Sequence, residues 1–102
     1  KKEFKVKQSK PVVICVFEKN SMKEYIKLQT ILRDAGISTE IYPGENKLKK
    51  QMEYANKIKA PAVILYGENE IKLEKPTLRD LSSGKEKSIT IKELVNEIKK
   101  II

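Results

Sequence analysis

Two short hydrophobic runs stand out in the pattern of hydrophobic and polar positions along the chain. Residues 11–17 read PVVICVF and residues 61–66 read PAVILY, and both runs are rich in β-branched residues. Continuous runs of this kind are typical of strands that are covered on both faces in a parallel sheet. A third strand is predicted at residues 38–42, after Gly36, which is a stop signal for the preceding helix. The two hydrophobic runs are therefore expected to be central strands.

Two amphipathic helices are predicted between these strands. The first begins at Ser21, which can form a capping box with Glu24. The second covers residues 46–59 and has apolar residues on one face, with lysines elsewhere around the helix. The apolar faces consist of Tyr25, Leu28, Leu32 and Ala35 in the first helix, and of Leu48, Met52, Ala55 and Ile58 in the second. Helical connections between parallel strands are right-handed in nearly all proteins, which sets the handedness of this half.

The pattern changes in the last third of the chain. Residues 77–81 and 88–91 are short strand candidates joined by the turn segment 82–85, which predicts a β-hairpin. Thr90 and Glu93 form a second capping box, which opens an amphipathic helix. The apolar face of that helix is formed by Leu94, Val95, Ile98, Ile101 and Ile102. The whole pattern predicts an α/β domain with a parallel half, a hairpin and a closing helix.

Composition and charge limit the classes of function. The chain has 102 residues, which is enough for one domain with an ordinary core. Its 22 Lys and Arg residues against 14 Asp and Glu residues give a net charge of +8, which favours a polyanionic partner. The absence of His and the single Cys exclude a Ser-His-Asp triad, a Cys-His pair, an intramolecular disulfide and most zinc sites.

Cysteine usage and hydropathy also bear on the location of the protein. One Cys indicates no secreted disulfide framework, and no hydrophobic run approaches the roughly 18 residues that span a bilayer. A cytoplasmic protein is therefore expected. The chain opens at Lys1 with neither Met nor a signal-peptide pattern, so we expect it to be a fragment of a longer protein.

Cys15 is the candidate nucleophile, and its position argues against catalysis. It lies inside the first hydrophobic run, where a thiol is usually an inert core group. A phosphocysteine carrier would need small residues after that strand, but residues 17–20 read FEKN. The four glycines are scattered and the glutamates lack the spacing of a metal loop, so no phosphate-binding glycine loop or metal ligand is assigned. A small phosphocarrier enzyme with Cys15 as its nucleophile is the alternative reading of the fold.

Basic side chains gather on and around the predicted hairpin. They are Lys75, Arg79, Lys85 and Lys87. A surface of this kind can bind phosphates, and Arg79 could hold an exposed base through two hydrogen bonds, which a lysine cannot reproduce. The alternative is that these charges protect an edge strand against aggregation.

Several segments within residues 35–95 occur in the order and spacing of a known protein family. The segments are AGI at 35–37, KLKKQMEYAN at 47–56, GENE at 67–70, and TLRDL followed by SSGKE at 77–86. Over about sixty residues the chain thereby resembles the C-terminal anticodon-binding domain of class II histidyl-tRNA synthetases. The resemblance implies a mixed five-stranded sheet with three helices, in the order strand, helix, strand, helix, three strands, helix.

The resemblance also implies which residues meet RNA. In this family the bases of a splayed anticodon loop are read from one edge of the sheet. A carboxylate accepts hydrogen bonds from base amino groups, and a guanidinium reaches O6 and N7 of guanine. The implied anticodon-binding residues are Glu45, Asn46, Lys47, Glu70 and Arg79. The implied phosphate-binding residues are Lys49, Lys50, Lys75, Lys85 and Lys87, and Gln51 is expected at the phosphates or on the helix surface.

Two segments depart from the family's pattern. The first strand of the family commonly ends in a Pro-Leu-Gly type turn, whereas here Phe17 is followed by Glu18 and Lys19. The segment before the fourth strand usually contains Gly, whereas residues 73–76 read LEKP. Contacts of the first segment with RNA are therefore not carried over, and the approach of Arg79 to a base is expected to depend on the second.

The resemblance finally implies a larger enzyme around this chain. Residues 1–10 are interpreted as a basic tether from a catalytic part that lies outside the chain, and residues 11–102 as the anticodon-binding domain. Such an enzyme attaches histidine to its tRNA, is expected to be a homodimer, and binds ATP and Mg²⁺ in the catalytic part, with no cofactor in this chain. The alternative is a stand-alone or regulatory RNA-binding module of the same fold.

Overall fold

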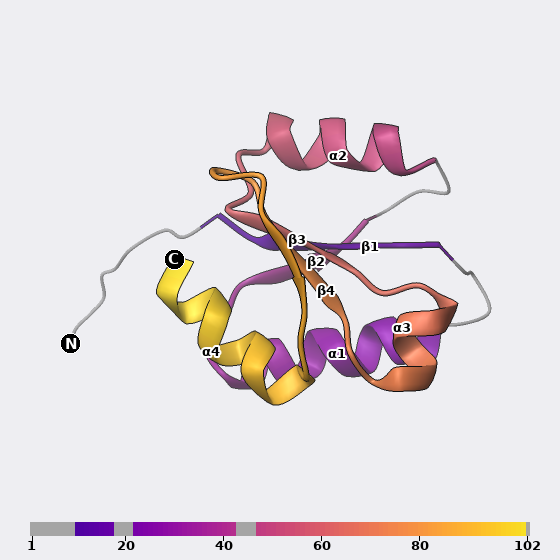
Figure 1. Ribbon diagram of the computed structural model, residues 1–102. Helices are drawn as coiled ribbons and strands as arrows, with labels where there is room; N and C mark the ends of the chain where they lie inside the picture. The colour runs from indigo at the N-terminus through magenta and orange to yellow at the C-terminus, as the bar shows by residue number, and fades with distance from the viewer. Residues whose placement is uncertain (1–9, 18–21, 43–46, 102) are drawn as a thin grey trace.

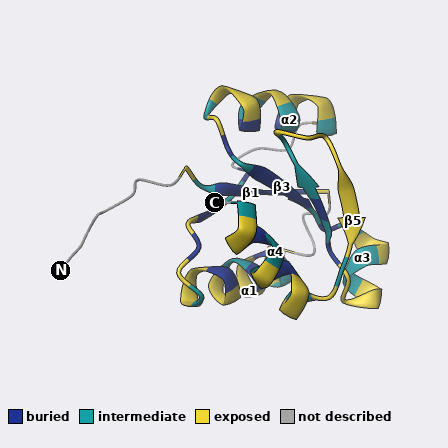
Figure 2. Ribbon diagram, turned by 60° about the vertical axis from the view of Figure 1, so that its left-hand side comes forward, coloured by how far each residue is buried: buried dark blue, intermediate teal, exposed yellow. Residues whose placement is uncertain are grey.

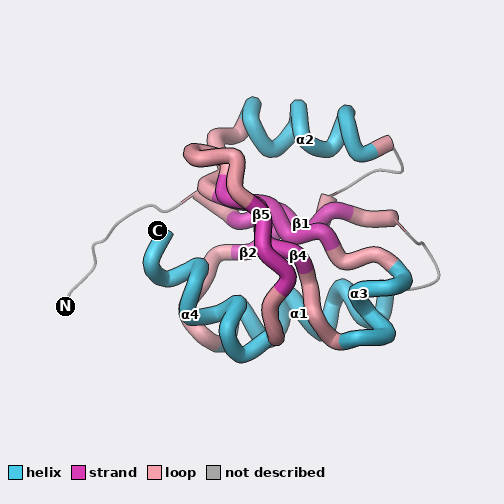
Figure 3. Tube along the Cα trace, in the orientation of Figure 1, coloured by secondary structure: helices cyan, strands magenta, loops and turns pink. Residues whose placement is uncertain are grey.

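A five-stranded sheet with the strand order β2-β1-β3-β4-β5 forms the centre of the molecule (Figures 1 and 3). The structure is a computed structural model, and it describes residues 10–17, 22–42 and 47–101. The elements are β1 (Val12–Cys15), α1 (Met22–Asp34), β2 (Thr39–Ile41), α2 (Leu48–Lys57), β3 (Ala62–Leu65), α3 (Glu68–Leu73), β4 (Thr77–Asp80), β5 (Glu86–Ser88) and α4 (Ile91–Ile101).

The sheet is mixed, as the sequence predicts. β1 pairs in parallel with both β2 and β3, whereas β4 is antiparallel to β3 and to β5. The two helices that connect the parallel strands lie on opposite faces: α2 covers one side of the sheet, and α1, α3 and α4 cover the other (Figure 1). Cover on both faces explains why β1 and β3 are continuous hydrophobic runs.

The core lies on both sides of β1 and β3 (Figure 2). All of β1 is buried, and α1 contributes the predicted residues Tyr25, Leu28 and Leu32. Leu94 and Ile98 are the buried residues of α4, as its predicted apolar face requires. In α2, Ala55 is buried, and the other predicted apolar residues pack half-buried against the core. The hydrophobic spacing therefore identified the inward faces correctly.

The structure corrects the predicted helix count. Four helices are present among the described residues rather than three, because α3 forms a short helix directly after β3. Glu68 and Glu70 in its first turn favour a helix N-terminus, and Glu74 ends it in the left-handed conformation, with φ of 55°. Six residues, none of them buried, leave no apolar periodicity to detect.

The hairpin and the second capping box are confirmed with small shifts of boundary. The Thr90 hydroxyl accepts from the Glu93 backbone N–H and the Glu93 carboxylate accepts from that of Thr90, both at 3.2 Å. β5 covers Glu86–Ser88 rather than the predicted residues 88–91. It ends earlier than predicted because Thr90 caps α4, which begins at Ile91. The predicted cap at Ser21 and most of the predicted tether, residues 1–9, lie outside the described residues.

Candidate nucleic-acid interface

The Gln51 side chain attaches the first turn of α2 to the carboxyl end of β1. Its Nε2 donates to the Val16 carbonyl and its Oε1 accepts from the Val16 N–H, both at 2.7 Å. Gln51 is fully buried, so the expectation that it lies on the helix surface or at phosphates is wrong. Satisfying both backbone groups of Val16 explains the burial of this polar residue. The pair of bonds holds Lys47 and Lys50, which are exposed, at this end of the sheet.

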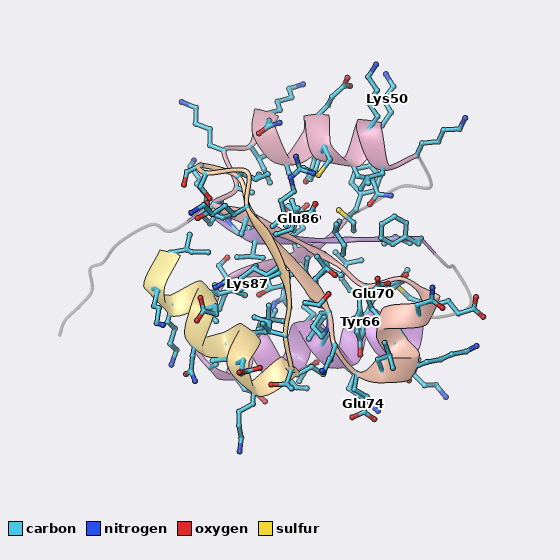
Figure 4. The ribbon with its side chains drawn as sticks, in the orientation of Figure 1. Lys50, Tyr66, Glu70, Glu74, Glu86 and Lys87 are labelled. Carbon is cyan, nitrogen blue, oxygen red and sulfur yellow. The ribbon has the colours of Figure 1, made fainter. Side chains whose placement is uncertain are left out.

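The Glu70 side chain lies at the same end, directly after β3. Its Oε1 accepts from the Gly67 backbone N–H at 2.9 Å, which caps the start of α3. This bond uses one of the two carboxylate oxygens. Because β1 and β3 are parallel neighbours, the segments that follow them emerge at one edge of the sheet. Figure 4 shows Lys50 on α2 and Glu70 on α3 toward this common end.

Arg79 lies further along the sheet and is paired across the hairpin. It stands opposite Glu86, and its Nη1 donates to Glu86 Oε2 at 3.1 Å. Its Nε is buried and has no hydrogen-bond partner among the described residues. A polar pair, the Thr77 and Ser88 hydroxyls 3.1 Å apart, lies on the same side of the hairpin. The guanidinium is therefore held by one carboxylate and still carries donors for a further acceptor.

Strand register gives the separation between Arg79 and Gly67, the residue that Glu70 caps. Thr77 pairs with Leu65, two residues before Gly67, and Arg79 pairs with Val63. Arg79 is thus about 13 Å from the level of Gly67 along the strand direction, at roughly 3.3 Å per residue. The two predicted base-reading residues do not form one compact pocket. An extended ligand, such as an opened loop of RNA, is required to touch both of them.

Comparison with known proteins identifies the fold family. The family described as anticodon binding domain matches residues 10–101. The chain belongs to this family. It is 39% identical over 105 residues to the histidine–tRNA ligase of Pelagibacter ubique, a match that covers 98% of the chain and 23% of that protein. A second relative is the histidine–tRNA ligase of Pyrococcus furiosus, which is 39% identical over 77 residues, or 76% of the chain and 18% of that enzyme.

Solved structures agree with this assignment. Histidyl-tRNA synthetase from Nostoc sp. PCC 7120 superimposes with a TM-score of 0.86 at 28% identity, covering 92% of the chain and 22% of that protein. The RNA binding domain of threonyl-tRNA synthetase from Cryptosporidium parvum shares the fold, with a TM-score of 0.82 at 14% identity over 90% of the chain and 23% of that chain. The chain spans about a fifth of the length of the curated relatives named above.

In this anticodon binding domain the basic residues of the hairpin lie on two opposite faces of the sheet. Leu78 and Lys87 form one cross-strand pair, and Lys87 donates to Glu97 of α4 at 3.0 Å. Successive side chains of a strand alternate between faces, so Arg79 and Glu86 point to the α2 side. Figure 4 shows Glu86 and Lys87 on opposite sides of the hairpin. Lys87 is therefore on the other face of the sheet from Arg79.

A pocket of about 380 Å³ lies between the hairpin and α4, on the Lys87 side. Its charged lining consists of Lys85, Lys87, Lys100, Asp80 and Glu97. Hydrogen bonds from Lys87 and Lys100 hold the pKa of Glu97 below its usual range, and hydrogen bonds from Ser82 lower the pKa of Asp80. Both carboxylates are therefore ionised at neutral pH, and they offset the lysines of this pocket.

The remaining predicted residues are placed as follows. Lys49 and Lys75 are exposed. Lys50 Nζ is 3.9 Å from Glu53 Oε1, and this pair is exposed, so the Lys50 ammonium stays largely in water. Glu45 and Asn46 lie outside the described residues. Cys15 is fully buried, as predicted, and burial raises the pKa of its thiol to about 12.

Neither a metal-binding cluster nor a membrane-spanning helix is found among the described residues. No three His, Cys, Asp or Glu side chains within residues 10–17, 22–42 and 47–101 are grouped so that they could hold a metal ion. The helices of this part of the chain are too short or too polar to cross a bilayer.

Proposed function

We propose that this domain binds the anticodon loop of a histidine-specific tRNA, as the C-terminal part of a histidine–tRNA ligase. The observation that carries the proposal is the match of residues 10–101 to the anticodon binding domain family, together with relatives that are histidine–tRNA ligases. The net charge of +8 supports it, because neutralising RNA phosphates requires cations. The domain contributes recognition rather than chemistry.

Base reading is proposed for the carboxyl end of β1 and β3, where Glu70 lies, and for the α2 face of the hairpin, where Arg79 lies. Glu70 would accept from a base amino or imino group, and Arg79 would donate to O6 and N7 of guanine. The exposed Lys47, at the start of α2, and Glu45 and Asn46 are kept in the proposal by resemblance. The separation of about 13 Å between Arg79 and the level of Gly67 fits a loop whose bases are splayed rather than stacked, because Glu70 and Arg79 then each meet a different base.

Phosphate contacts are proposed for the exposed lysines. Lys49 and Lys50 on α2 and Lys75 before β4 are free to reach the backbone of the same loop. Lys85 and Lys87 lie at the pocket on the α4 side, so RNA would reach them only by passing round the hairpin. Contacts to phosphate position an RNA without specifying its sequence.

Catalysis is proposed for the remainder of a longer enzyme, joined through residues 1–10. By the same resemblance, no step with ATP is assigned to this chain. In such an enzyme, ATP, Mg²⁺ and histidine would be bound by a separate catalytic domain. We also propose that the parent enzyme is a cytoplasmic homodimer, the usual setting implied by the resemblance.

The proposal is tested by titrating the 102-residue chain with anticodon stem-loops. A stem-loop with the histidine anticodon GUG is compared with loops of the same composition in shuffled order, at one salt concentration. We expect tighter binding of the GUG loop, with the difference lost when the loop is shuffled. Equal affinity for all loops would leave a non-specific RNA-binding module, and a class II catalytic domain encoded upstream would argue against a stand-alone role.

A further inference from the structure

Phe17 is a large aromatic residue that lies outside the core, directly after the carboxyl end of the central strand β1. It follows five buried residues, 12–16, and is itself 44% exposed. It is one of two Phe residues in the chain. Phe17 therefore presents an exposed aromatic surface directly after the buried strand β1.

The backbone that carries the Phe17 ring is fixed from two directions. The Phe17 N–H donates to the hydroxyl of the buried Tyr25 at 3.0 Å. The preceding residue, Val16, is held on both its N–H and its carbonyl by Gln51. An aromatic ring on such a fixed support loses little further backbone freedom when a ligand covers it.

The ring lies against Gly67, and this places it between the two groups of predicted RNA-binding residues. Phe17 Cδ2 is 3.6 Å from the point at which a Cβ on residue 67 would lie. Gly67 is the residue that Glu70 caps, and Gln51 brings the first turn of α2, with Lys47 and Lys50, to Val16. An exposed aromatic surface thus lies close to the Glu70 carboxylate, at the end of the sheet where α2 begins.

We propose that Phe17 is a stacking platform for one unpaired base of the bound RNA loop. The inference rests on the proposed function and deepens it. A base has an apolar face that can cover the ring and a polar perimeter that groups beside the ring can contact. The charge of +8 and the exposed lysines at the start of α2, Lys47 and Lys50, favour a nucleic acid over an apolar protein surface as the occupant. Glu70 is then the group that reads the edge of the stacked base.

The first experiment compares Phe17→Leu, which keeps an apolar side chain without a π-face, with the wild type on the GUG stem-loop. We expect Phe17→Leu to weaken binding about 5- to 150-fold, the range given by about 1–3 kcal/mol of stacking per base. The slope of log affinity against log salt should be unchanged, because no ion pair is lost. Leu73→Ala is the matched control, since Leu73 is 70% exposed on α3 and lies outside the proposed platform.

The second experiment uses Phe17→Trp, which introduces the only tryptophan into a chain that has none. We expect this variant to bind the GUG loop at least as tightly as the wild type. Its indole fluorescence should be quenched as the loop is added, because a stacked base lies on the ring. Urea unfolding of each variant checks that the half-exposed position has not changed the fold.

The outcomes separate this inference from the proposed function. If Phe17→Leu binds like the wild type, or if the Phe17→Trp fluorescence is unchanged at saturating RNA, the platform is wrong even when GUG is still preferred. If the wild type binds all loops equally but Phe17→Trp is quenched, the platform holds and the anticodon specificity fails. If the wild type binds no RNA, both proposals are wrong. The alternative is then that another part of the longer protein packs over Phe17.

Discussion

At the residue scale, the Arg79–Glu86 pair joins two neighbouring strands across the hairpin, and it depends on the exact register of β4 with β5. The pair is about two-fifths exposed on both sides, so solvent screening leaves it little net stability. Its larger effect is to orient the guanidinium.

Arg79→Ala is predicted to reduce discrimination between loops. If Arg79 reads an anticodon base, its loss costs about 1 to 3 kcal/mol against the GUG loop and much less against a loop with that base changed. Arg79→Lys should not restore the difference, because an ammonium lacks the planar two-point geometry. Equal weakening of every loop by Arg79→Ala would make Arg79 a phosphate contact instead.

Cys15→Ala is predicted to affect stability and not RNA binding. Deleting a fully buried sulfur leaves a small cavity, which we expect to cost about 1 to 2 kcal/mol in urea unfolding. In the folded wild type, iodoacetamide at pH 8 should not modify Cys15, because its thiol pKa of about 12 leaves almost no thiolate. Rapid alkylation of the native protein would revive the phosphocarrier alternative.

At the element scale, the position of α2 depends on one buried amide. Sequence periodicity identified the helix, and the family resemblance placed Gln51 at the phosphates or on the helix surface, where a glutamine is usually found. The buried bonds of Gln51 to Val16 link residues 35 positions apart, and periodicity within one helix holds no information on such contacts. The same limit explains why α3, a short helix defined by caps and not by a buried stripe, escaped prediction.

Gln51→Ala is predicted to be strongly destabilising. It leaves the buried N–H and carbonyl of Val16 without partners, and two such groups cost about 2 to 5 kcal/mol in the free energy of unfolding. Gln29→Ala is the control, because the half-buried Gln29 is also a helical glutamine whose Nε2 donates a hydrogen bond to a backbone carbonyl, that of Thr39, at 3.1 Å. If Gln51→Ala lowers the free energy of unfolding no more than Gln29→Ala does, this account of how α2 is attached is contradicted.

At the scale of the whole molecule, the sequence predicted the parallel half of the sheet well. The continuous runs of β1 and β3 require cover on both faces, and that requirement is visible in one sequence. The division of the basic residues between two sides was not visible, because it depends on the orientation of the hairpin against α4. The lysines of α2 and Arg79 share one side, whereas Lys87 is bound to Glu97 on the other.

This division predicts that replacing either of two lysines of equal charge changes the salt dependence of RNA binding by different amounts. Lys50→Ala should weaken binding of all stem-loops alike and reduce the slope of log affinity against log salt by about 0.7, the value for one phosphate contact on a single strand. Lys87→Ala should leave the slope for a short stem-loop nearly unchanged, since its ammonium is held by Glu97 on the α4 side. Equal changes for both variants would contradict the proposed path of the RNA.

The most direct test of the account is to map the surface that the RNA covers. Backbone amide NMR shifts of the 102-residue chain are followed during titration with the GUG stem-loop. We predict large shifts at Phe17, Gly67, Glu70 and Arg79, together with the first turn of α2, and small shifts along α4 and the exposed face of α1. Shifts concentrated on α1 and α4, with the residues around Phe17 and Glu70 unchanged, would contradict the account.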